Sequence, residues 1–141
     1  MKFMRWGKDG GPESTVWGFW AIEIKSLFSI VLLKFEDGSR QAYHTHAFHC
    51  FSWVLRGRLE EMFVDDLHYL LTSLWNRRRC VIHKPSVLPF ITRRSDFHKV
   101  ESRGVSWVLS FRGPWAKEWR EYIPAEDRYV TLTDGRREST L

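Results

Sequence analysis

Two histidines, His44 and His46, stand two residues apart, and a third, His98, lies far downstream. Side chains two residues apart on a β-strand point to the same face, so the first pair can present two imidazoles in one direction. Imidazole is the commonest protein ligand for transition metals. Three such ligands leave coordination positions open, which is typical of a site that binds and activates a small molecule rather than of a closed structural site. We therefore predict a metal centre at His44, His46 and His98.

Cys50 follows His46 by four residues and is in phase with the histidine pair. Three interpretations stay open: a small buried residue, a fourth ligand, or a redox-active thiol. His49 is out of phase with the pair, so we expect it to be exposed or to lie behind the ligands. His68 and His83 have no ligand-like neighbours in the sequence and are interpreted as structural or surface residues.

Charged residues occur in short runs. We interpret the arginines at 77–79, 93–94 and 136–137 as solvated strand ends and turns. The alternative is a phosphate-binding surface, since arginine pairs well with phosphate and the eight tryptophans can stack on bases. The acidic pairs Glu60-Glu61 and Asp65-Asp66 are expected to be exposed.

The composition is that of one globular domain. The chain has 141 residues, of which 43% are hydrophobic and 16% aromatic, and a core rich in aromatic residues favours sheet over helix. The net charge of +5 permits an anionic ligand or weak contact with nucleic acid but establishes neither. Two cysteines make no disulfide framework, so we expect a reducing, cytoplasmic setting. The N-terminal residues lack the apolar core of a signal peptide, and no apolar window is long enough to span a bilayer.

Short apolar runs separated by glycine and proline predict an all-β sandwich or small barrel. Alternate residues of each strand line the interior of such a barrel, where His44, His46 and His98 can converge. Asp37-Gly38 predicts a hairpin turn, and Gly57 predicts a second hairpin or a bent strand pair within 51–64. The leucine spacing at 67–74 predicts a short helix or one more strand. We divide the chain into an irregular N-terminal arm (1–15), a barrel (16–133) and a flexible tail (134–141). The expected strands are 16–24, 27–36, 40–46, 51–64, 79–82, 105–111 and 129–133, and a turn of helix is expected at 115–122.

The spacing of Gly38, His44-Thr45-His46, Cys50 and Gly57 resembles the first motif of the cupins, which normally has a glutamate at the position of Cys50. His98, with a proline upstream, is similar to the metal-binding histidine of the second cupin motif. The resemblance implies an all-β fold, a cupin double-stranded β-helix barrel with at most one short helix, and a divalent metal inside it. It also makes a homodimer an expectation.

Three segments further resemble the cysteine dioxygenase branch of the cupins: His44-Thr45-His46, His49-Cys50-Phe51 and His98-Lys99-Val100-Glu101. This resemblance implies Fe(II) held by the three histidines, and it makes Cys50 the candidate for a catalytic crosslink to a tyrosine. The strand at 105–111 has no tyrosine where that branch places it. The chain also looks like small cupin-like proteins carried by bacteriophages.

The resemblance thus implies a metal-dependent cupin, a non-haem iron oxygenase similar to the thiol dioxygenases, that acts on a small polar substrate. Phe48, Trp53 and Trp107 are expected to line a dry cavity around the metal. The alternative is a cupin-fold module that binds an anionic small molecule or a nucleotide without turnover. A third reading is a viral factor that occupies a host protein. No membrane partner is expected.

Overall fold

The computed structural model describes residues 1–10, 14–38, 43–64, 78–123, 126, 128–133 and 137–138. These residues form β-strands in three antiparallel sheets and, within the described ranges, no helix. Consequently these ranges hold no helix of the length and hydropathy needed to cross a membrane. The predicted helix at 67–74 lies outside the described residues.

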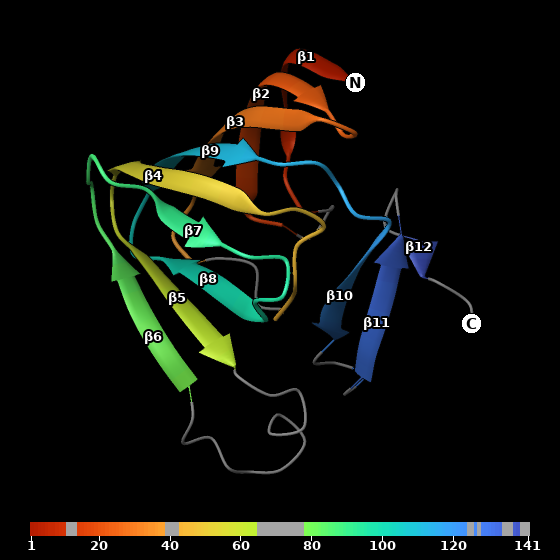
Figure 1. Ribbon diagram of the computed structural model, residues 1–141. Coiled ribbons are helices and arrows are strands. Elements are labelled where there is room, and N and C mark those ends of the chain that lie inside the picture. Colours follow the sequence, from red (N-terminus) through yellow and green to blue (C-terminus); the bar gives the residue numbers. More distant parts are fainter. Residues whose placement is uncertain are drawn as a thin grey trace.

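The largest sheet has six strands in the order β1-β2-β3-β9-β4-β7. In Figure 1 it forms the upper wall of the molecule, with β1 at one edge and β7 at the other. Its strands are β1 (Lys2–Lys8), β2 (Val16–Ile24), β3 (Phe28–Phe35), β9 (Ser106–Arg112), β4 (Cys50–Arg56) and β7 (Phe90–Thr92).

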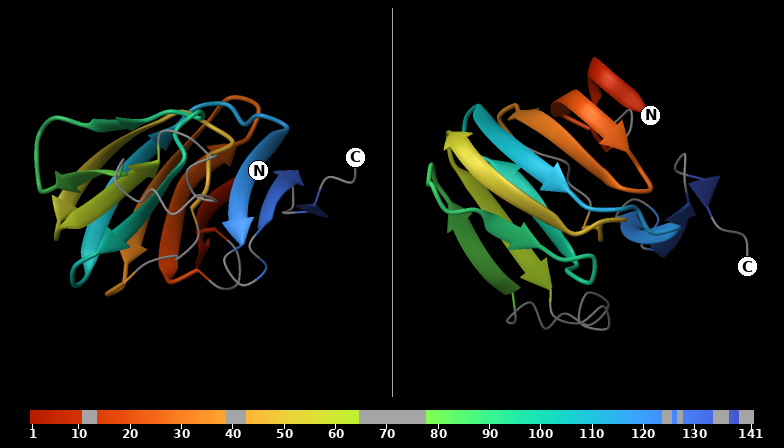
Figure 2. Two further views of the ribbon diagram at one scale, coloured as in Figure 1. Left: turned by 90° about the horizontal axis from the view of Figure 1, so that it is seen from below. Right: turned by 45° about the horizontal axis from the view of Figure 1, so that its top comes forward.

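Two smaller sheets complete the fold, one in the order β6-β5-β8 and one in the order β10-β11-β12. The first lies across from the large sheet and the second stands beside it (Figures 1 and 2). Their strands are β5 (Leu59–Val64), β6 (Arg78–His83), β8 (His98–Ser102), β10 (Glu118–Ile123), β11 (Arg128–Thr133) and β12 (Arg137–Glu138).

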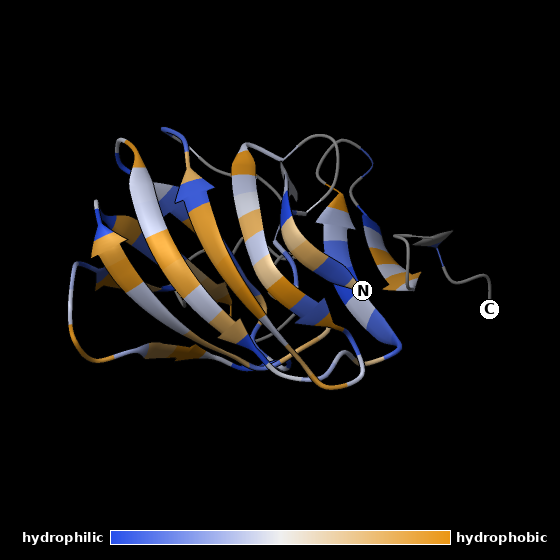
Figure 3. Ribbon diagram, turned by 90° about the horizontal axis from the view of Figure 1, so that it is seen from above, coloured by the Kyte–Doolittle hydropathy of each residue, from blue (hydrophilic) through white to orange (hydrophobic). Residues whose placement is uncertain are grey.

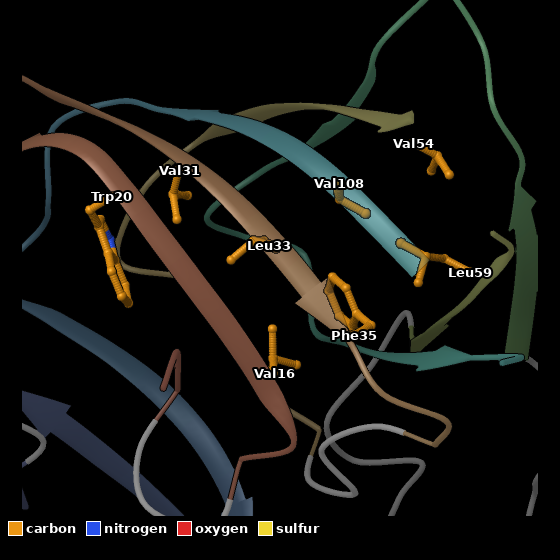
Figure 4. Packing of buried hydrophobic residues seen from close by; sticks show 8 residues of the cluster. All are labelled: Val16, Trp20, Val31, Leu33, Phe35, Val54, Leu59 and Val108. Carbon is orange, nitrogen blue, oxygen red and sulfur yellow. The ribbon is translucent and has the colours of Figure 1, made fainter. Parts of the chain in front are cut away.

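A hydrophobic core joins the large sheet to the sheet of β5, β6 and β8. Leu59 of β5 packs in one buried cluster with residues of β2, β3, β4 and β9, and Val100 of β8 packs against that cluster. Burying these side chains removes apolar surface from water and holds the two sheets face to face. The buried members, shown in Figure 4, are Val16, Trp20, Val31, Leu33, Phe35, Val54, Leu59 and Val108.

Gly57 carries the chain from β4 in one sheet to β5 in the other. Its φ of 94° lies in the left-handed region, which side chains other than glycine rarely adopt. A Cβ at this position would lie 2.3 Å from the Ser106 hydroxyl oxygen. The predicted bend at Gly57 is therefore confirmed, but β4 pairs with β9 and β7 whereas β5 pairs with β6 and β8, so 51–64 is not a hairpin.

Side chains alternate along β9, where Ser106 and Val108 are buried and Trp107 between them points out of the barrel. On β4, Trp53 alternates in the same way between the buried Ser52 and Val54. The hydropathy colouring of Figure 3 shows hydrophobic segments along the strands seen from this side. The prediction that Trp53 and Trp107 line the cavity was therefore wrong, because both project from the outer face of the large sheet.

Three further expectations need correction. Residues 2–8, expected to be irregular, form β1 and pair with β2. The segment 115–122, expected to form a turn of helix, contributes to β10, which pairs with β11. The hairpin predicted at Asp37-Gly38 does not form, since β3 pairs with β2 and β9 instead. Residues 39–42 lie outside the described ranges, and His44 forms isolated bridges rather than a strand.

Candidate metal centre

The three predicted histidines meet inside the barrel. The ligand nitrogens of His44, His46 and His98 all lie within 4.8 Å of one another. His98 is the first residue of β8, and His44 lies in the connection that precedes β4. His46 and His98, which are 52 residues apart in the sequence, are thus brought together, as predicted for a small barrel.

Backbone hydrogen bonds hold this arrangement. The His44 N–H donates to the His98 carbonyl at 2.9 Å, and the His98 N–H donates back to the His44 carbonyl at 3.0 Å. On its other side, the Thr45 N–H donates to the carbonyl of Arg120 in β10 at 2.8 Å. The Arg120 N–H in turn donates to the Thr45 hydroxyl at 2.9 Å. The histidine segment therefore bridges two sheets, which fixes it without a strand of its own.

The imidazole rings face one another closely. His46 Nε2 lies 2.8 Å from His98 Nε2, so one of these atoms donates a proton to the lone pair of the other. The His44 ring centroid lies 4.9 Å from that of His46 and 5.0 Å from that of His98. His98 is buried with 1% exposure, whereas His46 is partly buried.

Glu61 on β5 lies behind His98 and was not predicted to belong to the site. Its side chain is 1% exposed, and one carboxylate oxygen accepts a hydrogen bond from His98 Nδ1 at 2.5 Å. The other oxygen accepts a hydrogen bond from His83 Nε2 at 2.7 Å. The expectation that Glu61 is exposed was wrong, and His83 belongs to this network. Glu61 lies two residues from each of the hydrophobic, buried Leu59 and Phe63 on β5, so its side chain is on the same face of the strand as theirs. This spacing would have identified Glu61 as inward-facing.

Burial by itself would raise the pKa of Glu61, but the hydrogen bonds that its carboxylate accepts from His83 and His98 outweigh it. The pKa of Glu61 is therefore lowered, and the group is an anion at neutral pH. As an acceptor it fixes the proton of His98 on Nδ1, which leaves the Nε2 lone pair pointing at His46. A histidine oriented through its second nitrogen by a carboxylate is the usual arrangement around a protein-bound metal. The donor set and its orientation thus fit a transition metal.

The histidines form part of the wall of a cavity of about 310 Å³. Phe48 lines this cavity as predicted, and so does Cys50. The volume is at the lower end of the range of about 300 to 1,000 Å³ that small-molecule sites span, so it suits a small ligand.

Cys50 is buried in this wall, and its sulfur lies outside the group of three ligand nitrogens. Burial raises the pKa of the thiol, and the nearby charge of Arg112 offsets part of that effect. The thiol is therefore protonated at neutral pH. Cys50 packs in a cluster with Ala47 and Phe48, against which Trp115 and Trp119 pack.

Several other candidates lie away from the cavity. His49 is exposed, as expected, and its Nδ1 accepts a hydrogen bond from the Arg94 N–H at 3.2 Å. Arg93 and Arg94 are exposed, and Arg79 lies over the Phe63 ring at 4.5 Å. The side chains at 77–78 and 136–137, His68 and the pair Asp65-Asp66 fall outside the described residues.

No protein-family model matches the sequence, and no curated protein matches it either. Solved structures match the fold at low identity. The polyketide cyclase RemF from Streptomyces resistomycificus has a TM-score of 0.63 at 14% identity over 88% of this chain and 83% of that protein. A sugar phosphate isomerase of the cupin superfamily from Silicibacter pomeroyi has a TM-score of 0.54 at 13% identity, with 86% and 73% covered.

The Fe(II) form of HppE has a TM-score of 0.56 at 12% identity over 77% of this chain. The chain spans only 55% of HppE and 42% of an oxalate oxidase that also matches. The likeness to RemF, to the sugar phosphate isomerase and to HppE confirms the predicted fold: the chain adopts the all-β cupin barrel.

Proposed function

We propose that this cupin-fold chain is a metal-dependent enzyme in which His44, His46 and His98 hold a divalent transition metal, with Fe(II) as the working ion. The reaction we propose is a dioxygenase reaction on a small polar substrate. The observation that carries the proposal is the convergence of three imidazoles backed by the buried carboxylate of Glu61.

The donor set suits this role because three neutral imidazoles bind first-row metals and leave positions open for substrate and dioxygen. Iron held there would supply the redox chemistry that amino-acid side chains cannot perform. Glu61 keeps the His98 proton on Nδ1 and the ring in place. Phe63 stacks on the His98 ring with centroids 5.8 Å apart, which shields that ring from water.

Thiol oxidation is the narrow form of this proposal, in which Cys50 is the catalytic candidate. Cys50 faces the same cavity as the three histidines. Cys50 packs on Ala47 and Phe48, and the polar residues Ser52, Thr92 and Arg112 also lie beside it; none of these described neighbours is a tyrosine. We therefore separate the general dioxygenase proposal from any crosslink to Cys50.

Oxygen uptake tests the proposal. Protein purified without a histidine tag is loaded anaerobically with Fe(II) and mixed with a panel of small thiols and their hydroxyl analogues in an oxygen electrode. We expect substrate-dependent uptake that is lost in His98→Ala and kept in His49→Ala, whose ring is exposed and outside the site. Uptake that survives in His98→Ala, or none with any substrate, contradicts the dioxygenase proposal. Uptake with hydroxyl compounds alone contradicts only its thiol form.

A binding module is the second candidate function, and the charge of the cavity favours it. Four cationic side chains and two carboxylates line the cavity, so its described wall is formally positive. A bound anion raises the melting temperature by mass action. A rise with nucleotides in metal-free protein, without oxygen uptake in the iron-loaded form, would support this second function. The lining residues with formal charge are Lys2, Lys8, Lys25, Arg112, Asp9 and Glu23.

A further inference from the structure

Glu61, the buried carboxylate behind the candidate metal centre, is shared between two histidines of different strands. Its strand β5 lies between β8 and β6 in one antiparallel sheet (Figure 1). His98 on β8 pairs in register with Phe63, two residues after Glu61. His83 on β6 pairs with Leu59, two residues before it. His98, Glu61 and His83 therefore form a diagonal row on the inner face of this sheet, where diagonal neighbours are within reach of one another.

The two histidines bind separate oxygens of the Glu61 carboxylate. His98 Nδ1 donates to Oε1 at 2.5 Å, and His83 Nε2 donates to Oε2 at 2.7 Å. The Glu61 side chain is 1% exposed, so bulk water cannot take the place of a lost donor. A carboxylate that is held at both oxygens cannot turn without breaking a hydrogen bond. His83 therefore fixes the direction in which Glu61 presents its other oxygen to His98.

The ring of His83 is itself held by the large sheet. It stacks on Phe90 of β7, with the ring centroids 3.9 Å apart and the planes inclined by 21°. Phe90 packs against the core cluster that joins the two sheets. The His83 side chain is 13% exposed, so packing rather than solvent sets its position. His83 is thus fixed on its face by Phe90 and at its edge by Glu61.

We propose that His83 is a positioning residue of the metal centre, which acts on His98 through Glu61 rather than by contact with a ligand. The inference deepens the function proposed above and rests on it for the presence of a metal. Partners behind metal ligands fix the orientation and the protonated nitrogen of a histidine ring. Without the His83 donor, Glu61 can turn away and His98 can carry its proton on either nitrogen. A metal would then compete with that proton for Nε2.

Metal affinity tests this role. Zn(II), which has no redox chemistry, is the probe, and untagged, metal-stripped protein competes for it with a chelator. We expect His83→Leu to bind Zn(II) about tenfold more weakly than wild type, at the lower end of the usual loss for a partner behind a metal ligand. His83→Gln places an amide N–H close to the position of Nε2 and is expected to restore most of the affinity.

His49→Leu is the matched control, since His49 is exposed and lies outside the site. Its Zn(II) affinity is expected to equal that of wild type. Equal affinities of His83→Leu and wild type, or equal losses in His83→Leu and His83→Gln, overturn the proposal.

The tautomer of His98 is a readout that a merely structural role of His83 would not move. Ring-nitrogen NMR is recorded on nitrogen-15-labelled, metal-free protein, and the His98 signals are assigned from their loss in His98→Gln. In wild type and in His83→Gln we expect one protonated and one unprotonated nitrogen with well-separated shifts. In His83→Leu the two shifts are expected to approach each other, because both tautomers are sampled.

His83→Asn is a second variant that keeps a polar side chain but is too short to reach Glu61. It replaces the leucine variant if that variant does not fold, and it is expected to show the same averaged shifts of the His98 nitrogens. Well-separated His98 shifts in these variants, as in wild type, overturn the proposal.

Wild-type protein separates this inference from the proposed function. Wild type that binds neither Zn(II) nor Fe(II) refutes the proposed function, and the His98 tautomer then decides alone whether His83 acts through Glu61. Wild type that binds metal with an affinity that His83→Leu leaves unchanged refutes the role of His83 and leaves the metal centre standing.

Discussion

The inner face of the large sheet has two ends that differ in chemistry although the same strands form both. At one end Leu33 of β3 pairs with Val108 of β9, which pairs with Val54 of β4, and all three are buried hydrophobic residues. At the other end the same three strands contribute Ser29, Arg112 and Cys50. The apolar end lies in the core cluster that joins the sheets (Figure 4).

The two ends differ in what their residues contribute: the apolar residues stabilise the barrel, and the polar residues are available to a bound molecule. Apolar rows contribute burial energy in proportion to their area. Polar rows in the same interior add little net stability, and they are retained where a site needs them. We therefore expect substitutions at the apolar end to lower stability strongly, and substitutions of the buried polar side chains to lower it by much less.

Leu33→Ala is expected to have the largest effect on stability. Leu33 is 6% exposed within the core cluster, and truncating such a residue costs about 2 to 5 kcal/mol of unfolding free energy. Urea unfolding measures the loss, and elemental analysis of the folded variant is expected to give the wild-type metal content. A Leu33→Ala variant that keeps its stability but loses its metal would contradict the interpretation that the apolar end stabilises the barrel and does not affect the metal centre.

Glu61→Gln is expected to weaken metal binding by about 10- to 100-fold, because the amide no longer holds His98 as a charged acceptor does. A competition assay with a metal chelator measures the affinity. Glu60→Gln is the control in the neighbouring residue, whose carboxylate faces Arg58 and Arg103 on the surface instead. Similar affinities for the two variants would show that Glu61 does not support the metal centre.

The burial of Cys50 at the polar end can be tested by the pH dependence of stability. Burial raises the pKa of its thiol above the ordinary value of 9.0, so the folded state favours the neutral thiol. The stability that the neutral Cys50 thiol contributes is complete below the pKa of this thiol in the unfolded chain. It is lost as the pH rises from that value through the higher pKa of the thiol in the folded protein. Between pH 7 and pH 10, wild-type protein is expected to lose more stability in urea than Cys50→Ala. An equal loss would place Cys50 in a solvated environment.

The same burial predicts a difference between the two cysteines. Cys80 is exposed whereas Cys50 is buried, so Cys80 is expected to react with a thiol reagent well before Cys50 at pH 8. Mass spectrometry of partly labelled, digested protein identifies the modified residue. Faster labelling of Cys50 would mean that the polar end is open and its thiolate stabilised.

Ser110→Ala is expected to have the smallest effect. The Ser110 hydroxyl accepts a hydrogen bond from Ser52 at 3.1 Å inside the barrel, and such a bond contributes about 1 kcal/mol. A change of unfolding free energy near this value, with unchanged metal content, is the expected result of urea unfolding. A loss as large as that of Leu33→Ala would remove the distinction between the two ends.

The fold and the ligands were predictable because each left a local pattern. The spacing of His44 and His46 and the following Cys50 and Gly57 indicated a cupin, and long apolar runs such as 16–24 became strands. Alternation along β5 indicates that Glu61 faces inward, but its partners His83 and His98 depend on β5 lying between β6 and β8, a pairing that no local pattern encodes. Trp107 was misplaced for the same reason, since alternation shows which residues share a face but not which face is inside.

Metal content measured on untagged protein tests the central claim most directly. Elemental analysis of protein purified with and without added Fe(II) is compared for wild type, His46→Ala, His98→Ala and the control His49→Ala. The account predicts about one ion for each chain in wild type and in His49→Ala, and a loss of bound metal in the other two folded variants. Metal-free wild type, or metal retained in both His46→Ala and His98→Ala, would contradict it.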